Sequence, residues 1–152
     1  MNVLVIGSGG REHAIALAIS KSKKLTELYC APGNPGTKHI AENIALDISK
    51  HKDVVEFCKS NKIDLVVIGP EQPLVDGLAD SLRENSILVF GPSSNAARIE
   101  SSKSFAKEIM VNADVPTAAY QEFSADQFDD TINYLRESKY PIVLKADGLA
   151  AG

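Results

Sequence analysis

A glycine-rich segment near the N-terminus has the residue types of an anion-binding loop. The segment follows an apolar run, precedes a stretch with helical spacing, and reads Gly7-Ser8-Gly9-Gly10-Arg11. Without a Cβ, glycine lets the backbone turn sharply and approach a ligand, and the free N–H groups at a helix N-terminus favour an anion. Taken alone, the loop is also compatible with a tight strand-to-helix turn whose glycines serve packing only.

The loop departs from the fingerprint of dinucleotide-binding proteins. Gly7 and Gly9 match the first two glycines of G-x-G-x-x-G, but Glu12 stands in the third position. The next expected strand ends in Cys30-Ala31-Pro32 and supplies no acid to hold a ribose hydroxyl. Both departures argue against an NAD-dependent oxidoreductase.

Four further residues lie at positions where chemistry is plausible. Asn34, between two Pro-Gly pairs, is either ligand-facing or a turn residue, and Glu71 in Gly-Pro-Glu is either a hydrogen-bond acceptor for a sugar or amine or a solvated acid. Lys145 ends an apolar run before a glycine-rich loop, where an ammonium can reach phosphates. Lys103 by itself reads as a surface charge.

The elements that must position these residues alternate between strand and helix. Apolar runs at 2–7, 28–31, 63–68 and 87–90 each end in a Gly or Pro loop, and helical spacing follows around 14–19, 54–58 and 74–82. A further strand is expected at 44–48, with Ser49 as a helix cap. This pattern predicts a doubly wound, open parallel α/β sheet, in which loops at the carboxyl edge share one ligand site.

The pattern changes after Pro92. We expect a helix over 96–110, a strand at 118–123, a capping box at 124–127 in front of a helix, and a strand at 141–146 that enters the loop 147–152. A strand followed by nothing lacks partners to bury it. We therefore expect that the chain is cut short inside a second domain.

Composition excludes several classes of function. Sixteen basic and twenty acidic residues give a formal net charge of −4, which argues against a nucleic-acid partner. No apolar run reaches the roughly 18 to 20 residues of a membrane span, and no leader precedes the first strand, so we expect a cytoplasmic protein. Cys30 and Cys58 are expected to be buried, reduced thiols, and the histidines show no metal-ligand spacing.

Six blocks in one order closely resemble the phosphoribosylamine–glycine ligase family of the ATP-grasp superfamily. The joint order is far more specific than any single block. The blocks are Gly7–Ala14, Pro32–Gly36, Gly69–Leu74, Gly91–Ser93, Glu100–Phe105 and Lys145–Gly152. Gln72 departs from the small residue often found there, which puts little in doubt.

The resemblance implies ATP-dependent ligation of glycine to 5-phosphoribosylamine through an acyl phosphate, in purine biosynthesis. It implies a Rossmann-like pre-ATP-grasp domain over 1–92, a connecting helix over 93–115, and the start of an ATP-grasp domain over 116–152. It also implies Mg²⁺ or Mn²⁺, whose ligands are expected beyond Gly152. A monomer is favoured, and the 152-residue piece is expected to be inactive alone.

The resemblance also assigns residues, and it leaves no catalytic or metal-binding residue assignable here. Phosphoribosylamine would contact Ser8, Gly9, Gly10, Arg11, Asn34, Pro35 and Glu71. ATP would contact Lys103, Lys145, Asp147, Gly148 and Gly152. Two other interpretations stay open: a different ATP-grasp carboxylate–amine ligase, and a non-catalytic module that binds a sugar phosphate or nucleotide.

Overall fold

A computed structural model describes residues 1–149 of the chain. The chain divides into two compact units, residues 1–98 and residues 99–152, which we describe separately. No helix in the described part has the length and apolar character needed to cross a bilayer.

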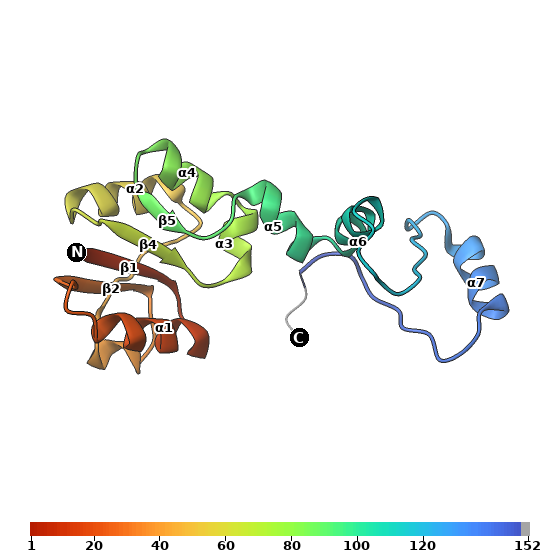
Figure 1. The fold of residues 1–152 in the computed structure, drawn as a ribbon, viewed down its shortest axis with the longest axis horizontal. Coiled ribbons are helices and arrows are strands. Elements are labelled where there is room, and N and C mark those ends of the chain that lie inside the picture. Colours follow the sequence, from red (N-terminus) through yellow and green to blue (C-terminus); the bar gives the residue numbers. More distant parts are fainter. Residues whose placement is uncertain (150–152) are drawn as a thin grey trace. The chain divides into compact units, whose positions relative to one another are not determined.

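The first unit is built on a five-stranded parallel sheet with the order β3-β2-β1-β4-β5 (Figure 1). The central strand, β1, pairs with β2 on one side and β4 on the other. The strands are β1 (Asn2–Gly7), β2 (Glu27–Pro32), β3 (Glu42–Asn43), β4 (Leu65–Ile68) and β5 (Leu88–Phe90). The expected doubly wound, open parallel sheet is confirmed.

Helices cover both faces of this sheet, with α1 on one face and α2 and α4 on the other (Figure 1). Alternate residues of β1 enter the two cores: Leu4 and Ile6 pack with α2 and α4, whereas Val3 and Val5 pack with α1. This two-sided burial explains the unbroken apolar runs of β1 and β4. The helices and the 3₁₀ turn of this unit are α1 (Gly10–Ser20), η1 (Thr37–His39), α2 (His51–Ser60), α3 (Glu71–Val75) and α4 (Leu78–Glu84).

Two expectations around residues 42–50 are wrong in detail. The strand is the short β3, and residues 44–48 instead form an irregular segment whose Ile44, Leu46 and Ile48 pack against the core. Ser49 does not cap α2, because its hydroxyl and N–H both donate to the Asp47 carboxylate and the N-cap is Lys50. An Asx-type turn therefore precedes the helix where a direct cap was expected.

The single helix expected over 74–82 is also wrong, because the structure has two helices, α3 and α4. Gly77 lies between them with φ +88°, a left-handed conformation that interrupts the helix. The apolar spacing continues across the break, since Leu74, Leu78 and Leu82 are all buried. Spacing alone could not reveal the interruption.

Strand β5, which forms within the apolar run 87–90, is only partly buried. It is an edge strand, and Leu88 and Phe90 are 67% and 71% exposed. Only Val89 packs against the core on the α4 side. Helix α1 does not extend over β5, so one face of this strand stays uncovered within the first unit.

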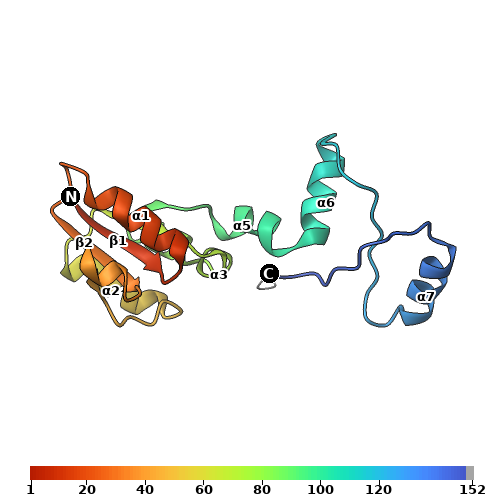
Figure 2. The same cartoon turned by 90° about the horizontal axis from the view of Figure 1, so that it is seen from below.

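The second unit contains the end of α5 (Ser94–Ser101), then α6 (Lys103–Asn112) and α7 (Phe128–Glu137). The helix expected over 96–110 is interrupted at Ser102, whose hydroxyl accepts a hydrogen bond from the Phe105 N–H and caps α6. The expected capping box is formed in part: the Gln127 side chain accepts the Ser124 N–H, but Gln127 itself is the N-cap of α7. Figure 2 shows the extended segments that join α6 to α7.

The strands expected at 118–123 and 141–146 are absent from the described residues. Neither segment has strand hydrogen bonding, and Val143 and Leu144 are 76% and 69% exposed. A strand exists only when a neighbouring strand accepts its hydrogen bonds. Between residues 99 and 149 no such neighbour is present.

Candidate functional site

The glycine loop connects the central strand to α1, as expected. Gly7 ends β1 with φ +128°, Gly9 is the N-cap, and α1 begins at Gly10. Ser8, Gly9, Gly10 and Arg11 are all exposed. The first N–H groups of α1 have no partner within the helix, so the loop presents the features of an anion site.

The second loop is joined to the first by Asn34. Its side-chain amide donates to the Ser8 carbonyl at 3.0 Å and to the Gly9 carbonyl at 3.4 Å, while its Oδ1 accepts the N–H groups of Gly36 and Thr37 at 2.8 and 3.0 Å. The side chain thus uses both its donor and its acceptor within the protein. Asn34 is therefore a turn residue of the second loop, and it also connects that loop to the first. The neighbouring Pro35 is exposed.

Two polar residues that sequence reasoning missed hold this second loop. Thr37 is fully buried, and its hydroxyl interacts with the backbone of Asn34 and with Oδ1 of Asn43 at 2.7 Å. The Asn43 amide donates to the Asn34 carbonyl at 2.7 Å. In the sequence, Thr37 and Asn43 are simply polar residues that follow a Pro-Gly turn, and polar residues in such a place do not predict burial.

The third loop contacts the first through Arg11. The Arg11 guanidinium donates to the Gly69 carbonyl at 2.7 Å and forms an ion pair with Glu71 at 2.8 Å. This hydrogen bond from Arg11 is the main cause that lowers the pKa of Glu71 below its ordinary value. Both side chains are well exposed, at 59% and 42%. Arg11 and Glu71 are therefore accessible to a ligand as a pair of opposite charges.

Three of the four expected loops meet at the carboxyl edge of the sheet. The Gly33 N–H donates to Gly7, and the Gly69 N–H donates to Ile6, both at 3.1 Å. The loop after β5 is held differently: Arg83 donates to the Gly91 carbonyl, and Asp80 accepts the Ser94 N–H at 2.8 Å. The structure therefore joins the first three loops directly and ties the fourth to α4.

Glu12, which replaced the third glycine of the dinucleotide fingerprint, is buried beneath the first loop. It is 5% exposed, and its Oε2 accepts the Gly9 N–H at 2.7 Å. Beside it on α1, the ring of His13 lies against Gly36, so close that a Cβ at Gly36 would collide with it. His13 therefore packs against the second loop.

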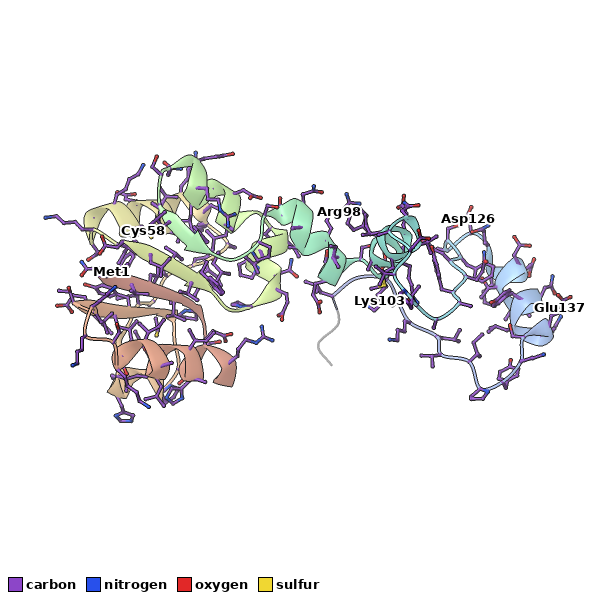
Figure 3. All side chains as sticks on the ribbon, viewed as in Figure 1. Met1, Cys58, Arg98, Lys103, Asp126 and Glu137 are labelled. Atoms are coloured by element: carbon purple, nitrogen blue, oxygen red, sulfur yellow. The ribbon has the colours of Figure 1, made fainter. Side chains whose placement is uncertain are left out.

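In the second unit, Lys103 and Asp147 bring the start of α6 to the glycine-rich loop. Lys103 begins α6 (Figure 3), and its ammonium donates to the Gly148 carbonyl at 2.7 Å. The Asp147 carboxylate accepts the Ser102 hydroxyl at 3.0 Å and the N–H groups of Lys103 and Ser104. Desolvation raises the pKa of Asp147, but these hydrogen bonds outweigh it and hold that pKa below its usual range.

A hollow of about 430 Å³ lies beside this junction. Its walls include Glu100, Lys103, Lys107, Met110 and Gly148. Lys145 is exposed, and no hydrogen bond among residues 1–149 joins it to Lys103. Gly152 lies outside the described residues. The structure therefore brings together Lys103, Asp147 and Gly148.

Two family models together match the whole chain. The family model described as phosphoribosylglycinamide synthetase, N domain, matches residues 1–100, and the model for the ATP-grasp (A) domain of the same synthetase matches residues 101–152. The chain belongs to the phosphoribosylglycinamide synthetase family. The resemblance inferred from the six blocks is thereby confirmed.

Relatives of this synthetase family match the whole chain. The chain is 55% identical over 152 residues to the phosphoribosylamine–glycine ligase of Mesorhizobium japonicum and 52% identical to that of Rhizobium meliloti, covering 35% and 36% of those proteins. It thus spans about a third of the length of these relatives. The crystal structure of the Thermotoga maritima phosphoribosylamine–glycine ligase matches 98% of this chain and 34% of its own, with 31% identity and a TM-score of 0.72.

A more distant likeness supports the fold alone. The biotin carboxylase domain of the Hydrogenobacter thermophilus 2-oxoglutarate carboxylase matches 92% of this chain and 33% of its own, with 17% identity and a TM-score of 0.67. At that identity it indicates a shared arrangement of strands and helices. It carries no statement about substrate.

The remaining His, Cys, Asp and Glu residues of the described part form no cluster suited to a metal ion. Among residues 1–149 there is no group of three His, Cys, Asp or Glu side chains that could hold a metal. Cys30 and Cys58 are free and buried, as expected. Burial raises the pKa of Cys58 to about 11 and also raises that of Cys30, which a hydrogen bond with Thr37 partly offsets.

Proposed function

We propose that this chain is the N-terminal part of an enzyme that joins glycine to 5-phosphoribosylamine with ATP, and that its first unit binds the sugar phosphate. The observation that carries the proposal is the junction of the loops at Gly7, Pro32 and Gly69 in a chain whose full length matches phosphoribosylamine–glycine ligases. The activity belongs to the longer polypeptide. The 152-residue chain is expected to bind but not to turn over.

The chemistry requires activation of a carboxylate. ATP transfers its terminal phosphoryl group to a glycine carboxylate oxygen, which gives glycyl phosphate and ADP. The amine of phosphoribosylamine then attacks the acyl carbon, the C–O bond to phosphate breaks, and the amine loses a proton. The products are glycinamide ribonucleotide, ADP and phosphate. The protein must therefore hold an amine, a carboxylate and a triphosphate in line.

The first loop supplies the phosphate end of this site. We place the phosphate of phosphoribosylamine over Ser8, Gly9 and Gly10, at the N-terminus of α1, because the free N–H groups and positive end of the helix favour a dianion. Arg11 adds an exposed positive charge at the same end. A guanidinium that donates to a carboxylate can donate to a phosphate oxygen in its place.

The other two loops shape the sugar end. Asn34 fixes the distance between the first and second loops, and Pro35 lies exposed on the second, where it can contact the ligand. Glu71 accepts from Arg11 at one oxygen, which leaves acceptor capacity for a ribose hydroxyl or the reacting amine. Like any glutamate of ordinary pKa it is an anion at neutral pH, and the hydrogen bond from Arg11 lowers its pKa further.

The second unit supplies the beginning of the nucleotide site. Lys103, which contacts the Gly148 carbonyl, and Lys145 would neutralise phosphate oxygens, and the backbone of 147–152 would form the covering loop. Asp147 would serve this site by fixing the loop to the start of α6. The reaction class calls for Mg²⁺ or Mn²⁺, but the described residues provide no ligand set, so we derive no step through a metal from this chain.

The remaining features follow from this assignment. We propose a substrate-binding domain over 1–92, a connecting helix over 93–115 and the start of an ATP-grasp domain over 116–152. The division into units near residue 98 and the meeting of the two family models at residue 100 support a boundary within that connection. We further propose a cytoplasmic, monomeric enzyme that takes small molecules and no nucleic acid.

The test uses the full-length enzyme encoded by the gene. Phosphate release from ATP should require both glycine and freshly prepared phosphoribosylamine, with magnesium present. Lys145→Ala should weaken ATP binding, whereas Lys52→Ala, on the outer surface of α2, should leave it unchanged. No turnover in a folded preparation would contradict the proposed reaction, and turnover with another carboxylate in place of glycine would favour a different ATP-grasp ligase.

A further inference from the structure

The buried carboxylate of Glu12 has no part in the proposed reaction, yet it lies directly beneath the loop that would bind the sugar phosphate. We infer that Glu12 is a positioning residue: it holds the glycine loop and the end of β4 in the arrangement that presents the first N–H groups of α1 to the ligand. The inference deepens the proposed function, on which its ligand rests. Two independent observations carry it.

The first observation is a hydrogen bond that selects which amides face the ligand. Glu12 Oε2 accepts the Gly9 N–H at 2.7 Å, from one turn inside α1 back to its N-cap. The carboxyl group is largely removed from water, so few solvent molecules compete for this bond. The amide of Gly9 is therefore committed to Glu12, so an anion placed over Ser8, Gly9 and Gly10 would take its hydrogen bonds at this helix end from the amides that begin at Gly10.

The second observation is the space that the side chain fills. A Cβ placed on Gly7 would lie 2.5 Å from Cγ of Glu12, and a Cβ on Gly69 would overlap the Glu12 carboxylate. Glu12 therefore occupies the gap between the ends of β1 and β4, the point at which the strand order reverses. Two backbones that approach a side chain this closely cannot shift unless the side chain moves.

Together these contacts connect Glu12 to two of the three loops of the site. The hydrogen bond fixes the first loop, and the packing fixes that loop against Gly69, whose carbonyl receives Arg11. Loss of the Glu12 side chain would leave a gap at the switch point and free the Gly9 amide. The phosphate loop and Arg11 would then no longer be held in register.

The experiment compares Glu12→Ala with Glu12→Gln in the full-length enzyme. The probes are ribose 5-phosphate, which lacks the reactive amine, and inorganic phosphate, both measured by titration calorimetry. Gln fills the same volume and its Oε1 can accept the Gly9 N–H, so its affinity should stay within about threefold of the original, whereas Ala should weaken ribose 5-phosphate about tenfold or more. If Ala does not fold, Glu12→Asp replaces it, since its shorter side chain keeps the charge but loses the reach.

A second readout is independent of any ligand. Amide hydrogen exchange should show faster exchange at Gly9 in Glu12→Ala and retained protection in Glu12→Gln. Val54→Ala serves as the matched control, because Val54 is a fully buried core residue of α2 and its loss lowers stability without touching the loop. Its affinity for ribose 5-phosphate should be unchanged under conditions where both variants are folded.

The outcomes separate this inference from the proposed function. Equal binding by Glu12→Ala and the original chain, with unchanged exchange at Gly9, would overturn the positioning role and leave the proposed function intact. Equal loss of affinity in Val54→Ala would reduce Glu12 to a stability residue. If the original chain bound neither probe, the sugar-phosphate assignment and the inference built on it would both be wrong.

Discussion

The guanidinium of Arg11 lies 2.8 Å from the carboxylate of Glu71, so the residue expected to bind a phosphate is paired with an acid from the neighbouring loop. The pair is exposed, and each partner has further hydrogen-bonding capacity. A ligand that carries both a phosphate and an amine or hydroxyls could engage both charges. This arrangement makes opposite predictions for the two residues.

Arg11→Ala should weaken ribose 5-phosphate binding about ten- to a hundredfold, because a hydrogen bond between charged groups contributes roughly 1.5–3 kcal/mol. Glu71→Gln should instead strengthen inorganic phosphate binding by up to about fivefold, since an exposed ion pair that competes for Arg11 is worth roughly 0.2–1 kcal/mol. Calorimetric titration measures both. If Arg11→Ala bound ribose 5-phosphate normally, the phosphate would have to lie elsewhere.

The pH dependence of the Arg11–Glu71 pair has a definite sign. Because the hydrogen bond from Arg11 lowers the pKa of Glu71 from its ordinary value of 4.5, the pair stabilises the folded chain above that value. The stabilisation is lost as the pH falls through the lowered value. A double-mutant cycle with Arg11→Ala and Glu71→Gln, followed by urea unfolding, should give a coupling of about 0.2–1 kcal/mol at pH 7 and a smaller one at pH 4. Coupling that increased towards low pH would contradict this assignment.

The Asn34 side chain donates to the first loop and accepts within the second, and variants can test the two sets of hydrogen bonds separately. Asn34→Asp keeps an acceptor for the N–H groups of Gly36 and Thr37 but sets a carboxylate oxygen against the carbonyls of Ser8 and Gly9, so it should lose ribose 5-phosphate affinity and stay more stable than Asn34→Ala. Asn34→Ala should also lower the free energy of unfolding by about 1–3 kcal/mol, because it leaves buried donors unsatisfied. Urea unfolding and calorimetry distinguish the two. Similar stabilities for both variants would show that the acceptor contacts contribute little.

Much of this site follows from sequence, and the remainder depends on contacts that spacing does not encode. Parallel strands bring their carboxyl ends to one edge, so the loops after Gly7, Pro32 and Gly69 could be placed together before any coordinates. The burial of Glu12 and Thr37 could not be predicted, because polar residues are usually solvated and their partners come from distant loops. Their roles emerge only from packing across loops.

The errors in the fold have the same origin. The break at Gly77 rests on a single left-handed residue inside a continuous apolar stripe, and the exposure of Phe90 depends on which strand lies at the edge of the sheet. Apolar periodicity reports which residues prefer burial but not whether a neighbour covers them. The segment 141–146 is apolar for the same reason and has no strand partner among the described residues.

Cys58 should be inert in the folded chain. Its burial raises the pKa to about 11, so almost none of it is thiolate at pH 7.5, and its sulfur is shielded from reagents. Iodoacetamide at that pH should leave Cys58 unmodified until urea unfolds the protein, as mass spectrometry of tryptic peptides can show. Cys30 is also free and buried, so its extent of labelling can be compared with that of Cys58 in the same digest. Rapid labelling of Cys58 under native conditions would mean that α2 opens readily from the sheet.

Asp147 should be required for the order of the first turn of α6. Its carboxylate receives the N–H groups of Lys103 and Ser104 and the Ser102 hydroxyl, contacts that also fix the position of the Lys103 ammonium beside Gly148. Asp147→Ala should therefore speed amide exchange at Lys103 and Ser104 and, in the full-length enzyme, raise the KM for ATP, whereas Asp147→Asn keeps an acceptor and should show a smaller effect. Asp126→Ala is the matched control, because Asp126 is an exposed aspartate whose carboxylate accepts a hydrogen bond from the Ser124 hydroxyl, ahead of α7. If Asp147→Ala left both amides as protected as in the control, the carboxylate would not hold the loop to the helix, and Lys103 would have to be positioned by its contact with Gly148 alone.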